Sequence, residues 1–377
     1  MKVGFDAKRF FNNFTGLGNY SRFVVDALST TETQSDFYLF TPKGRSHHEI
    51  DPLVSRSNVH VVEPTSFYKL PVLKSLWRSW GMSADQHMKE LDIFHGLSQE
   101  LPIGLPLKIK KVVTVHDLIF LRFPQYYNPV DVKIYRAKVK AACHHADKII
   151  AISKQTADDL VQYLSVNAKK IDVVYQGVHP IFRVRHTEKE IFEASRKYRL
   201  PDRYLLSVGT IEERKNTLLV IEALSLIPEQ ERVPLVIMGR ATKYKERLVA
   251  TIEKYKLGTW VHFLHDASFN DFPAIYQGAM VFLYPSRFEG FGIPLVEAIE
   301  SGIPVITSTG SCFHEAAGPS AVYVNPDDAI ALSQQLLLLS SDRLLREKMA
   351  IESQVFVQKF RPEIIAADIL KVYRELI

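Results

Sequence analysis

The stretch that decides the fold is Pro285-Ser286-Arg287-Phe288-Glu289-Gly290-Phe291-Gly292-Ile293-Pro294-Leu295-Val296-Glu297-Ala298. The apolar run 280–284 before it suits a buried parallel strand, which Pro285 closes. Gly290 and Gly292 allow the backbone to approach a ligand, and Pro294 stands where the first turn of a helix tolerates proline. The stretch therefore predicts a strand, a glycine loop and a helix whose first N–H groups offer a seat for a diphosphate.

Two carboxylates flank this loop, Glu289 before it and Glu297 inside the helix. Their spacing, Glu-x7-Glu around Gly-Phe-Gly-x-Pro, resembles the signature of glycosyltransferase family 4, whose members have the two-domain GT-B fold. The resemblance implies that a nucleotide sugar is held here, with donor contacts from Phe291, Gly292, Leu295 and Glu297. In the alternative interpretation, Glu297 is a first-turn glutamate favoured by the helix dipole and Glu289 is a solvated loop residue.

Composition indicates an ordinary globular protein with more than one core. The chain has 377 residues, of which 46% are hydrophobic and 24% charged, and this length favours two domains. Cys143 and Cys312 are the only cysteines, so neither a disulfide framework nor a zinc cluster is expected. The net charge of +5 is mild, so nucleic acid is not expected as a partner, whereas binding to anionic membrane lipid is left as an alternative. With no apolar signal region at its start, the protein is expected in the cytoplasm, with peripheral contact to the inner face of the plasma membrane left open.

Strand-like segments alternate with helical ones in two successive series, which predicts an α/β protein with two doubly wound, Rossmann-like domains. We expect an N-terminal domain at 1–180, a C-terminal nucleotide-sugar-binding domain at 181–360, and a final helix at 361–377 that packs back on the first domain. In the GT-B fold two such domains face each other across a cleft. The expected strands are 2–6, 37–40, 59–62, 92–95, 111–115, 148–152 and 171–175 in the first series, and 205–208, 235–238, 261–263, 280–284, 304–307 and 322–324 in the second. The segments 176–180 and 186–199 lack strand character and are interpreted as the crossing between domains.

In the first series, Gly16 and Gly18 form a glycine loop that opens a helix. The third glycine of a dinucleotide fingerprint is replaced by Ser21, so redox chemistry of the Rossmann type is not favoured. The resemblance places the loop under the donor diphosphate and the acceptor, and it places His116, at the end of the strand 111–115, against the transferred sugar. The alternatives are that the glycine loop binds no ligand and that the ring of His116 donates a hydrogen bond to a neighbouring carbonyl group.

Two other polar residues of the first series come directly after strands. Asp117 is interpreted either as a member of the ligand crevice or as a cap for the next turn of the chain. Ser153 is as well explained as a helix N-cap as by a ligand contact.

In the second series, Arg214 and Lys215 come after the strand 205–208. Two adjacent cations at a strand end neutralise a diphosphate and stabilise the charge that develops on it as a leaving group. The segment resembles the family's Val-Gly-Arg or Val-Gly-Thr strand followed by Arg-Lys-Asn. Because Thr210 stands here at the first basic position, Arg214 and Lys215 are left to carry the charge. By the same resemblance the strand end at Leu264 lies where the nucleotide base is held.

Two segments carry both apolar and basic residues. The segment 69–89, with Trp77 and Trp80, has helical apolar spacing and is interpreted as an amphipathic helix that covers its own sheet, with an anionic membrane surface as the alternative. The basic run at Lys133, Arg136, Lys138 and Lys140 raises the same pair of interpretations.

The chemistry expected is a transfer without a metal cofactor, because the sequence lacks Asp-x-Asp, His-Glu-x-x-His and Cys-x-x-Cys. Glu297 is expected to accept hydrogen bonds from ribose hydroxyls and Glu289 from sugar hydroxyls. His116, Glu289, Lys215 and Arg214 form the expected catalytic set, and family members retain the anomeric configuration. The resemblance to mannosyltransferase-like members suggests GDP-mannose as donor and a glycan or lipid-linked acceptor in polysaccharide biosynthesis.

Three alternatives remain open from the sequence: a sugar-nucleotide epimerase, a phosphorylase of the same fold that uses a pyridoxal lysine, and a binding module without turnover.

Overall fold

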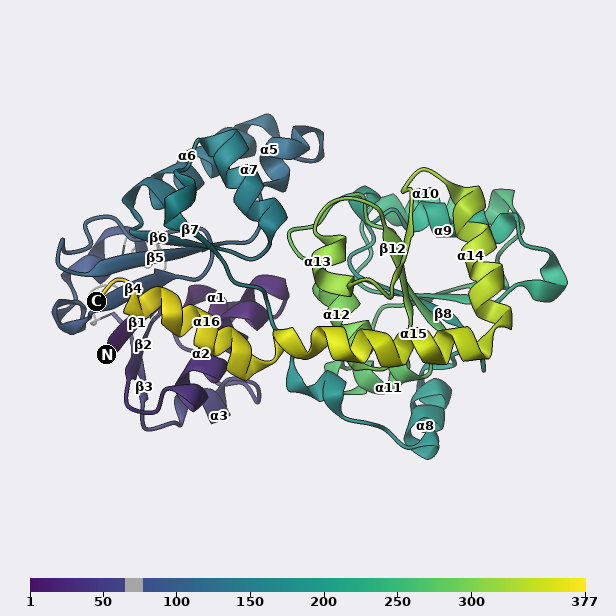
Figure 1. Ribbon diagram of the computed structural model, residues 1–377, viewed down its shortest axis with the longest axis horizontal. Helices are drawn as coiled ribbons and strands as arrows, with labels where there is room; N and C mark the ends of the chain where they lie inside the picture. The colour runs from purple at the N-terminus through teal and green to yellow at the C-terminus, as the bar shows by residue number, and fades with distance from the viewer. Residues whose placement is uncertain (65–76) are drawn as a thin grey trace. The chain divides into compact units, whose positions relative to one another are not determined.

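The computed structural model describes residues 1–64 and 77–377, without the side chains of Ser79 and Trp80. This part of the chain divides into two compact units. The first unit comprises residues 1–177 together with 360–377, and the second comprises residues 178–359. Each contains its own sheet, as the strand labels in Figure 1 show.

The first unit is built on a parallel sheet with the strand order β3-β2-β1-β4-β5-β6-β7. Its chain runs from β1 outward to β2 and β3, then returns to β4 on the other side of β1. The order therefore reverses between β1 and β4, which is where parallel α/β sheets bind ligands at the carboxyl ends of their strands. The strands are β1 (Lys2–Asp6), β2 (Asp36–Phe40), β3 (Val59–Val62), β4 (Ile93–Gly96), β5 (Lys110–Val115), β6 (Lys148–Ala151) and β7 (Ile171–Val173).

Helices cover both faces of this sheet. On one face, α5 (Ile119–Arg122), α6 (Pro129–His145) and α7 (Lys154–Leu164) share a core with β5 and β6. Elsewhere in the unit lie α1 (Lys8–Asn12), α2 (Gly16–Thr31), α3 (Asp51–Val54) and α16 (Pro362–Arg374).

The last helix of the chain is part of the first unit. In Figure 1, α16 is the yellow helix that lies beside α2, and the two are in contact. Its buried face includes Tyr373, whose hydroxyl lies 2.6 Å from Nδ1 of the buried His95 on β4. The surface of the helix adds ion pairs from Arg374 to Glu32 and from Glu375 to Lys148. The C-terminal residues thus complete the core of the N-terminal unit.

The second unit contains a parallel sheet with the order β10-β9-β8-β11-β12-β13. Here the order reverses between β8 and β11. The strands are β8 (Leu205–Val208), β9 (Leu235–Met238), β10 (Val261–Leu264), β11 (Val281–Tyr284), β12 (Val305–Ser308) and β13 (Val322–Val324).

Alternate residues of these strands face different helices. Val281 and Leu283 join a core with α9 (Thr217–Ser225), α10 (Tyr244–Lys254) and α14 (Ala329–Ser341). Phe282 and Tyr284 point the other way: Phe282 stacks on Tyr276 of α11 (Phe272–Gln277), and Tyr284 meets Phe313 of α13 (Phe313–Ala317) edge to face. This is the two-residue period of a strand that is covered on both faces. The unit also contains α8 (Glu188–Tyr198), α12 (Ile293–Glu300) and α15 (Arg343–Phe356).

Every strand expected from the sequence is present within one or two residues of its predicted bounds. One expectation was wrong: the segment 186–199 is not a crossing but contains α8, which packs against α11 inside the second unit. The Thr187 hydroxyl accepts from the backbone N–H of Glu190, and the Glu190 carboxylate accepts from the backbone N–H of Thr187, so a capping box starts this helix.

The amphipathic segment predicted at 69–89 lies partly outside the described residues. From Trp77 onward, the chain forms a short π-helical turn at Trp77–Gly81 and 3-10 turns at Met82–Ala84 and Gln86–Glu90, rather than one continuous helix. Trp77 is buried in a core with Phe40 and Phe94 of the sheet, as the sheet-covering interpretation requires. Among the described helices, none combines the length and the apolar character needed to cross a membrane.

The glycine loop of the first unit opens α2, whose first residue is Gly16. A Cβ atom on Gly18 would lie 1.6 Å from the carbonyl oxygen of Asn13, which comes from the link between α1 and α2. A Cβ atom on Gly16 would have no neighbour within 4 Å among the described residues. Gly18 is therefore required by packing, whereas Gly16 is open to its surroundings.

We predict that Gly18→Ala lowers the free energy of unfolding by about 1–3 kcal/mol, because the backbone of Asn13 must move to make room. Gly16→Ala is the matched control, and it should leave stability unchanged or raise it by up to about 1 kcal/mol. Urea unfolding of both variants checks this, and equal effects at the two positions would contradict the role of packing at Gly18.

Candidate functional site

The carboxylate of Glu289 is held between two cations in the second unit. Its Oε1 lies 2.7 Å from Nζ of Lys215, and its Oε2 lies 2.7 Å from Nη1 of Arg214. Glu289 is 8% exposed, so this ion cluster is largely shielded from water. The interpretation of Glu289 as a solvated loop residue is therefore wrong, and three of the charged residues predicted for the site, Glu289, Lys215 and Arg214, are in direct contact.

The two cations reach Glu289 because the chain turns sharply after β8. Residues 213–215 form a single 3-10 turn, and Asn216 then adopts a left-handed conformation with φ of 56° before α9 begins. The backbone N–H of Arg287 donates to the carbonyl of Arg214 at 2.9 Å and so joins this turn to the loop that carries Glu289.

The electrostatics of the cluster keep Glu289 ionised. Burial alone would raise the pKa of its carboxyl group, but the positive charges and hydrogen bonds of Lys215 and Arg214 outweigh burial and lower the pKa to about 2. The cluster therefore contributes stability above the ordinary glutamate pKa of about 4.5 that is lost as pH falls toward 2.

Arg214 and Lys215 differ in how many of their donors are occupied. The guanidinium of Arg214 also donates to the carbonyl of Phe288 and to the carboxylate of Glu212, each at 2.6 Å. The ammonium of Lys215 donates to Glu289 and to the hydroxyl of Tyr284 at 2.7 Å. Two of its three N–H groups are thus used within the described residues, which leaves one for a ligand oxygen.

A small pocket lies beside Lys215. It is lined at the ends of β8, β9 and β11 by Ser207, Val208, Gly209, Thr210, Lys215, Thr217, Ile237 and Tyr284. Gly209 and Gly239 bring two strand ends unusually close, since a Cβ on Gly239 would lie 2.0 Å from the carbonyl oxygen of Gly209. The pocket therefore stands at the reversal in strand order, and its lining includes one cation and four residues with a hydroxyl group, Ser207, Thr210, Thr217 and Tyr284.

The second glutamate, Glu297, is partly buried in α12 and has a different environment. The hydroxyl of Tyr276 donates to its Oε2 at 2.9 Å, and no cation pairs with it among the residues described. Burial raises the pKa of the Glu297 carboxyl to about 7, although the bond from Tyr276 acts in the opposite direction. It is not a residue of the first helical turn, so the alternative explanation by the helix dipole does not apply.

The loop between the glutamates begins α12 as the sequence predicted. Gly292 has φ of 101°, a conformation that suits glycine, and precedes the first helical residue, Ile293. The backbone N–H of Leu295, however, donates to the carbonyl of Gly292 at 2.9 Å, and Pro294 has no N–H. The first turn therefore offers fewer free donors than the sequence suggested. The side chains of Leu295 and Phe291 are buried, so any contact of these two residues with the nucleotide sugar would come from their backbone atoms.

The chain after β12 holds this loop in place. Ser311 accepts a hydrogen bond from the backbone N–H of Glu289 and donates to its carbonyl. The Sγ atom of Cys312 lies 3.0 Å from the carbonyl oxygen of Phe291. Cys312 is thus a buried structural residue, with the pKa of its thiol raised by burial.

In the first unit, His116 comes directly after β5 and is buried. Its Nε2 donates to the carbonyl of Leu97 at 2.8 Å, so the neutral ring accepts at Nδ1 from Nε2 of Gln176 at 3.2 Å. Burial lowers its pKa to about 4, and the nearby charge of Arg9 acts in the same direction. The neighbouring carbonyl that the alternative interpretation invoked is present, and the imidazole is neutral at pH 7.

The remaining candidates have structural partners or lie at the surface. The carboxylate of Asp117 accepts from the backbone N–H of Ile119, and Ser153 is the N-cap of α7. Leu264 ends β10 and is partly buried. The basic residues Lys133, Arg136, Lys138 and Lys140 are exposed on α6.

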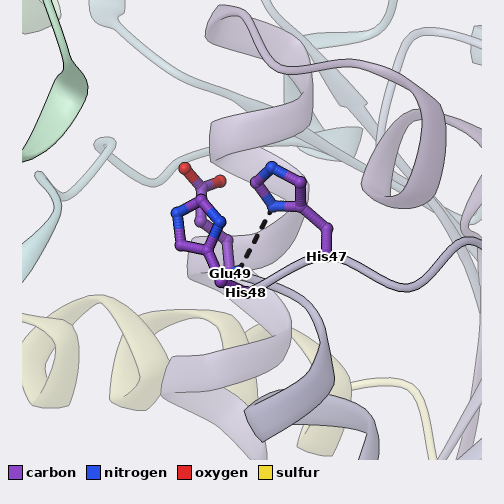
Figure 2. A group of neighbouring side chains, drawn as sticks. All are labelled: His47, His48 and Glu49. Carbon is purple, nitrogen blue, oxygen red and sulfur yellow. Dashed lines mark hydrogen bonds between the residues drawn. The ribbon is translucent and has the colours of Figure 1, made fainter.

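One group in the described residues brings three potential metal ligands together. His47, His48 and Glu49 have ligand atoms within 4.8 Å of one another, and Figure 2 shows their side chains in the loop before α3. Nδ1 of His47 accepts the backbone N–H of Glu49, and the Glu49 carboxylate lies 3.1 Å from Nε of Arg22. Because a cation already pairs with the only carboxylate of the group, we assign no metal to it.

Two tyrosines of the second unit were not predicted from the sequence. Tyr284 binds Lys215, and Tyr276 binds Glu297. Both are 3% exposed or less and stack on Phe282, so their apolar surroundings are those of a core residue. A tyrosine in an apolar run is expected to be buried, and a buried hydroxyl needs a hydrogen-bond partner. That requirement is the signal in the sequence that could have identified these two residues.

Comparisons with known proteins cover both units. A family model described as Glycosyltransferase Family 4 matches residues 15–181, and one described as Glycosyl transferases group 1 matches residues 188–355. The O-antigen chain mannosyltransferase B of Escherichia coli is 25% identical over 391 residues, covering 100% of both chains. The O-antigen chain mannosyltransferase RfbU of Salmonella typhimurium is 30% identical over 224 residues, which is 59% of each chain.

Solved structures resemble the whole chain. HepE of Anabaena, in complex with UDP and glucose, matches with a TM-score of 0.74 and 18% identity over 100% of both chains. WaaG, a glycosyltransferase involved in lipopolysaccharide biosynthesis, matches with a TM-score of 0.69 and 17% identity over 99% of this chain and 98% of its own. With its two parallel α/β sheets and both family matches, the chain belongs to glycosyltransferase family 4 and has the GT-B fold.

Proposed function

We propose that the protein transfers mannose from GDP-mannose to a glycan or lipid-linked acceptor during synthesis of a surface polysaccharide such as O-antigen, with retention of configuration and without a metal cofactor. The observation that carries the proposal is the Glu289–Lys215–Arg214 cluster beside the pocket at the ends of β8 and β11. The mannose assignment is supported by the names of the relatives, two of which are O-antigen chain mannosyltransferases.

The second unit has the groups needed to hold a nucleotide sugar. Lys215 lines the pocket and has an N–H group available for a diphosphate oxygen. Breaking the bond between sugar and diphosphate increases the negative charge on the leaving oxygen, and a cation preorganised there lowers the barrier. Arg214 and Tyr284 fix Lys215 and Glu289 in place, so we assign Arg214 chiefly to positioning.

Glu289 and Glu297 are proposed to bind different hydroxyl groups. Glu289 remains ionised and accepts from hydroxyls of the transferred sugar, while Glu297 accepts from the ribose. Leu264 remains the proposed neighbour of the base. The assignments of His116, Gly16 and Gly18 to the donor also remain proposals. A neutral His116 with a committed Nε2–H is suited to orient a ligand rather than to transfer a proton.

We predict that Glu297→Ala weakens binding of the nucleoside diphosphate by about 1–3 kcal/mol, because the ribose hydroxyls lose their acceptor. Isothermal calorimetry on the folded variant measures this. Unchanged affinity would refute the assignment.

A pH series sharpens this test. An ionised carboxylate accepts from both ribose hydroxyls, so wild-type affinity should increase as pH rises through about 7, where Glu297 loses its proton. Glu297→Gln is the matched control: it keeps the shape of the side chain, and its affinity should show only the titration of the nucleotide itself. Identical pH profiles for the two proteins would mean that Glu297 does not face the ligand.

Transfer should proceed in EDTA at an undiminished rate, because Lys215 takes the place of a divalent ion at the diphosphate. Sugar release and transfer from a radiolabelled donor are followed with and without chelator, and Lys215→Ala should lower the rate by a factor on the order of 100 or more. Loss of activity in EDTA that magnesium or manganese restores would contradict the proposed mechanism. Binding without release or transfer would favour a module that holds the donor without turnover.

The donor itself is tested with a thermal-shift panel of GDP, UDP and ADP sugars. A ligand present at 100 times its Kd stabilises the folded state by about 2.7 kcal/mol, so the true donor should raise Tm by several degrees. GDP-mannose is expected to do so. Stabilisation by a UDP sugar alone would overturn the mannose assignment and leave the glycosyltransferase assignment intact.

A further inference from the structure

The first unit carries two cations, Lys8 and Arg9, whose charges are not balanced by nearby carboxylates. We call them the basic pair. They open α1 directly after β1, at the point where the strand order of the sheet reverses between β1 and β4. Both residues are exposed. Because the carboxyl ends of strands at such a reversal are where α/β sheets bind ligands, this location is the expected one for a functional group of the first unit.

The carboxylates near the basic pair already have other partners. Asp6, at the end of β1, accepts from Nε of Arg78 at 2.7 Å. Glu100 pairs with Arg78 and, at 3.2 Å, with Lys138. In the described part of the chain no carboxylate forms an ion pair with the side chain of Lys8 or Arg9, and residues 65–76 contain no Asp or Glu that would supply one.

The cations of this region repel one another. Although Lys8 is exposed as a whole, partial desolvation by neighbouring atoms lowers the pKa of its ammonium, and the charges of Arg78 and Arg9 lower it further, against the weaker influence of Asp6 and Glu100. Arg9 is also close enough to His116 for its charge to lower the pKa of that ring. A group of like charges is unfavourable in the free protein and becomes favourable when an anion binds among them.

The basic pair also lies beside the glycine loop. The carbonyl oxygen of Arg9 would be 3.0 Å from a Cβ on Gly18, and the open side of Gly16 has no neighbour within 4 Å in the described chain. The region therefore combines cations without a counter-charge, a small exposed residue and a buried neutral histidine, all within the first unit.

We propose that Lys8 and Arg9 form a phosphate-binding subsite of the first unit that holds a phosphate group of the acceptor. This inference rests on the proposed function, because only a glycosyltransferase has an acceptor substrate whose phosphate the subsite could hold. A planar guanidinium and a flexible ammonium together supply several N–H donors to phosphate oxygens, which is a common pairing at phosphate sites.

The subsite is tested by measuring how fast Lys8 is acylated in the full-length protein, residue by residue, by mass spectrometry. The probe is inorganic pyrophosphate, and the reference is Lys189 on α8, whose side chain is 84% exposed. Pyrophosphate is expected to slow acylation of Lys8 several-fold and to leave Lys189 unchanged. Arg9→Gln should reduce that protection, whereas Arg343→Gln, which removes the same charge from the exposed α15, should not.

A second arm separates acceptor phosphate from donor diphosphate. The labelling is repeated with saturating GDP or UDP, whichever raises Tm. Protection of Lys8 by pyrophosphate that persists beside the nucleotide supports an acceptor subsite. Protection by the nucleotide itself would overturn that assignment, because the basic pair would then bind the donor. Absence of any protection of Lys8 relative to Lys189 would overturn the subsite altogether.

The kinetic counterpart uses Lys8→Gln/Arg9→Gln with a phosphate-bearing acceptor. The KM for acceptor should rise about tenfold, which corresponds to about 1.4 kcal/mol, while the KM for donor stays constant. Labelling of Lys8 does not require turnover, so the phosphate subsite and the proposed transferase activity can be refuted independently of each other. A protein that protects Lys8 but transfers no sugar would retain the phosphate subsite and lose the proposed function.

Discussion

The contact of Glu289 with Lys215 and Arg214 is the constraint on which the second unit depends. Removing one charge from a largely buried cluster of this kind leaves the others without a partner, and that costs more than an exposed ion pair contributes. The cluster also joins two parts of the chain, since Arg214 comes after β8, whereas Tyr284 ends β11 and Glu289 lies in the loop that follows it. The same interaction that fixes the loop thus sets the position of the cation beside the pocket.

The two glutamates show how one loop gives two carboxylates different properties. Glu289 has cations at both oxygens and a low pKa, whereas Glu297 has one tyrosine hydroxyl and a pKa of about 7. Neither property can be deduced from the Glu-x7-Glu spacing, because each depends on residues more than ten positions away in the chain. Arg214 lies 75 positions before Glu289, and Tyr276 lies 21 positions before Glu297. Tertiary contacts, rather than the motif, decide the chemistry of each group.

The central strands were predictable because they are short apolar runs covered on both faces, such as Leu235 to Met238, with turn residues at their ends. The helix α8 was not predicted, since its sequence is mainly polar and its apolar stripe is limited to Ile191, Ala194 and Tyr198, although Thr187 and Glu190 carried the signal of its start. The charged residues of the candidate site could be proposed from their types and their places at strand ends. Tyr284 and Tyr276 were not, because a tyrosine that stacks in a core and one that binds a functional residue have the same local sequence pattern.

The docking of α16 in the first unit has a consequence for synthesis of the protein on the ribosome. Residues 1–177 emerge before the second unit, yet the core of their unit is completed by Phe360–Ile377, which emerge after it. Until then His95 lacks the hydroxyl of Tyr373, and the face of α2 that α16 contacts stays open to water. The second unit, continuous in sequence, is able to fold as soon as residue 359 has left the exit tunnel, so the later half of the chain is expected to reach its native state before the earlier half.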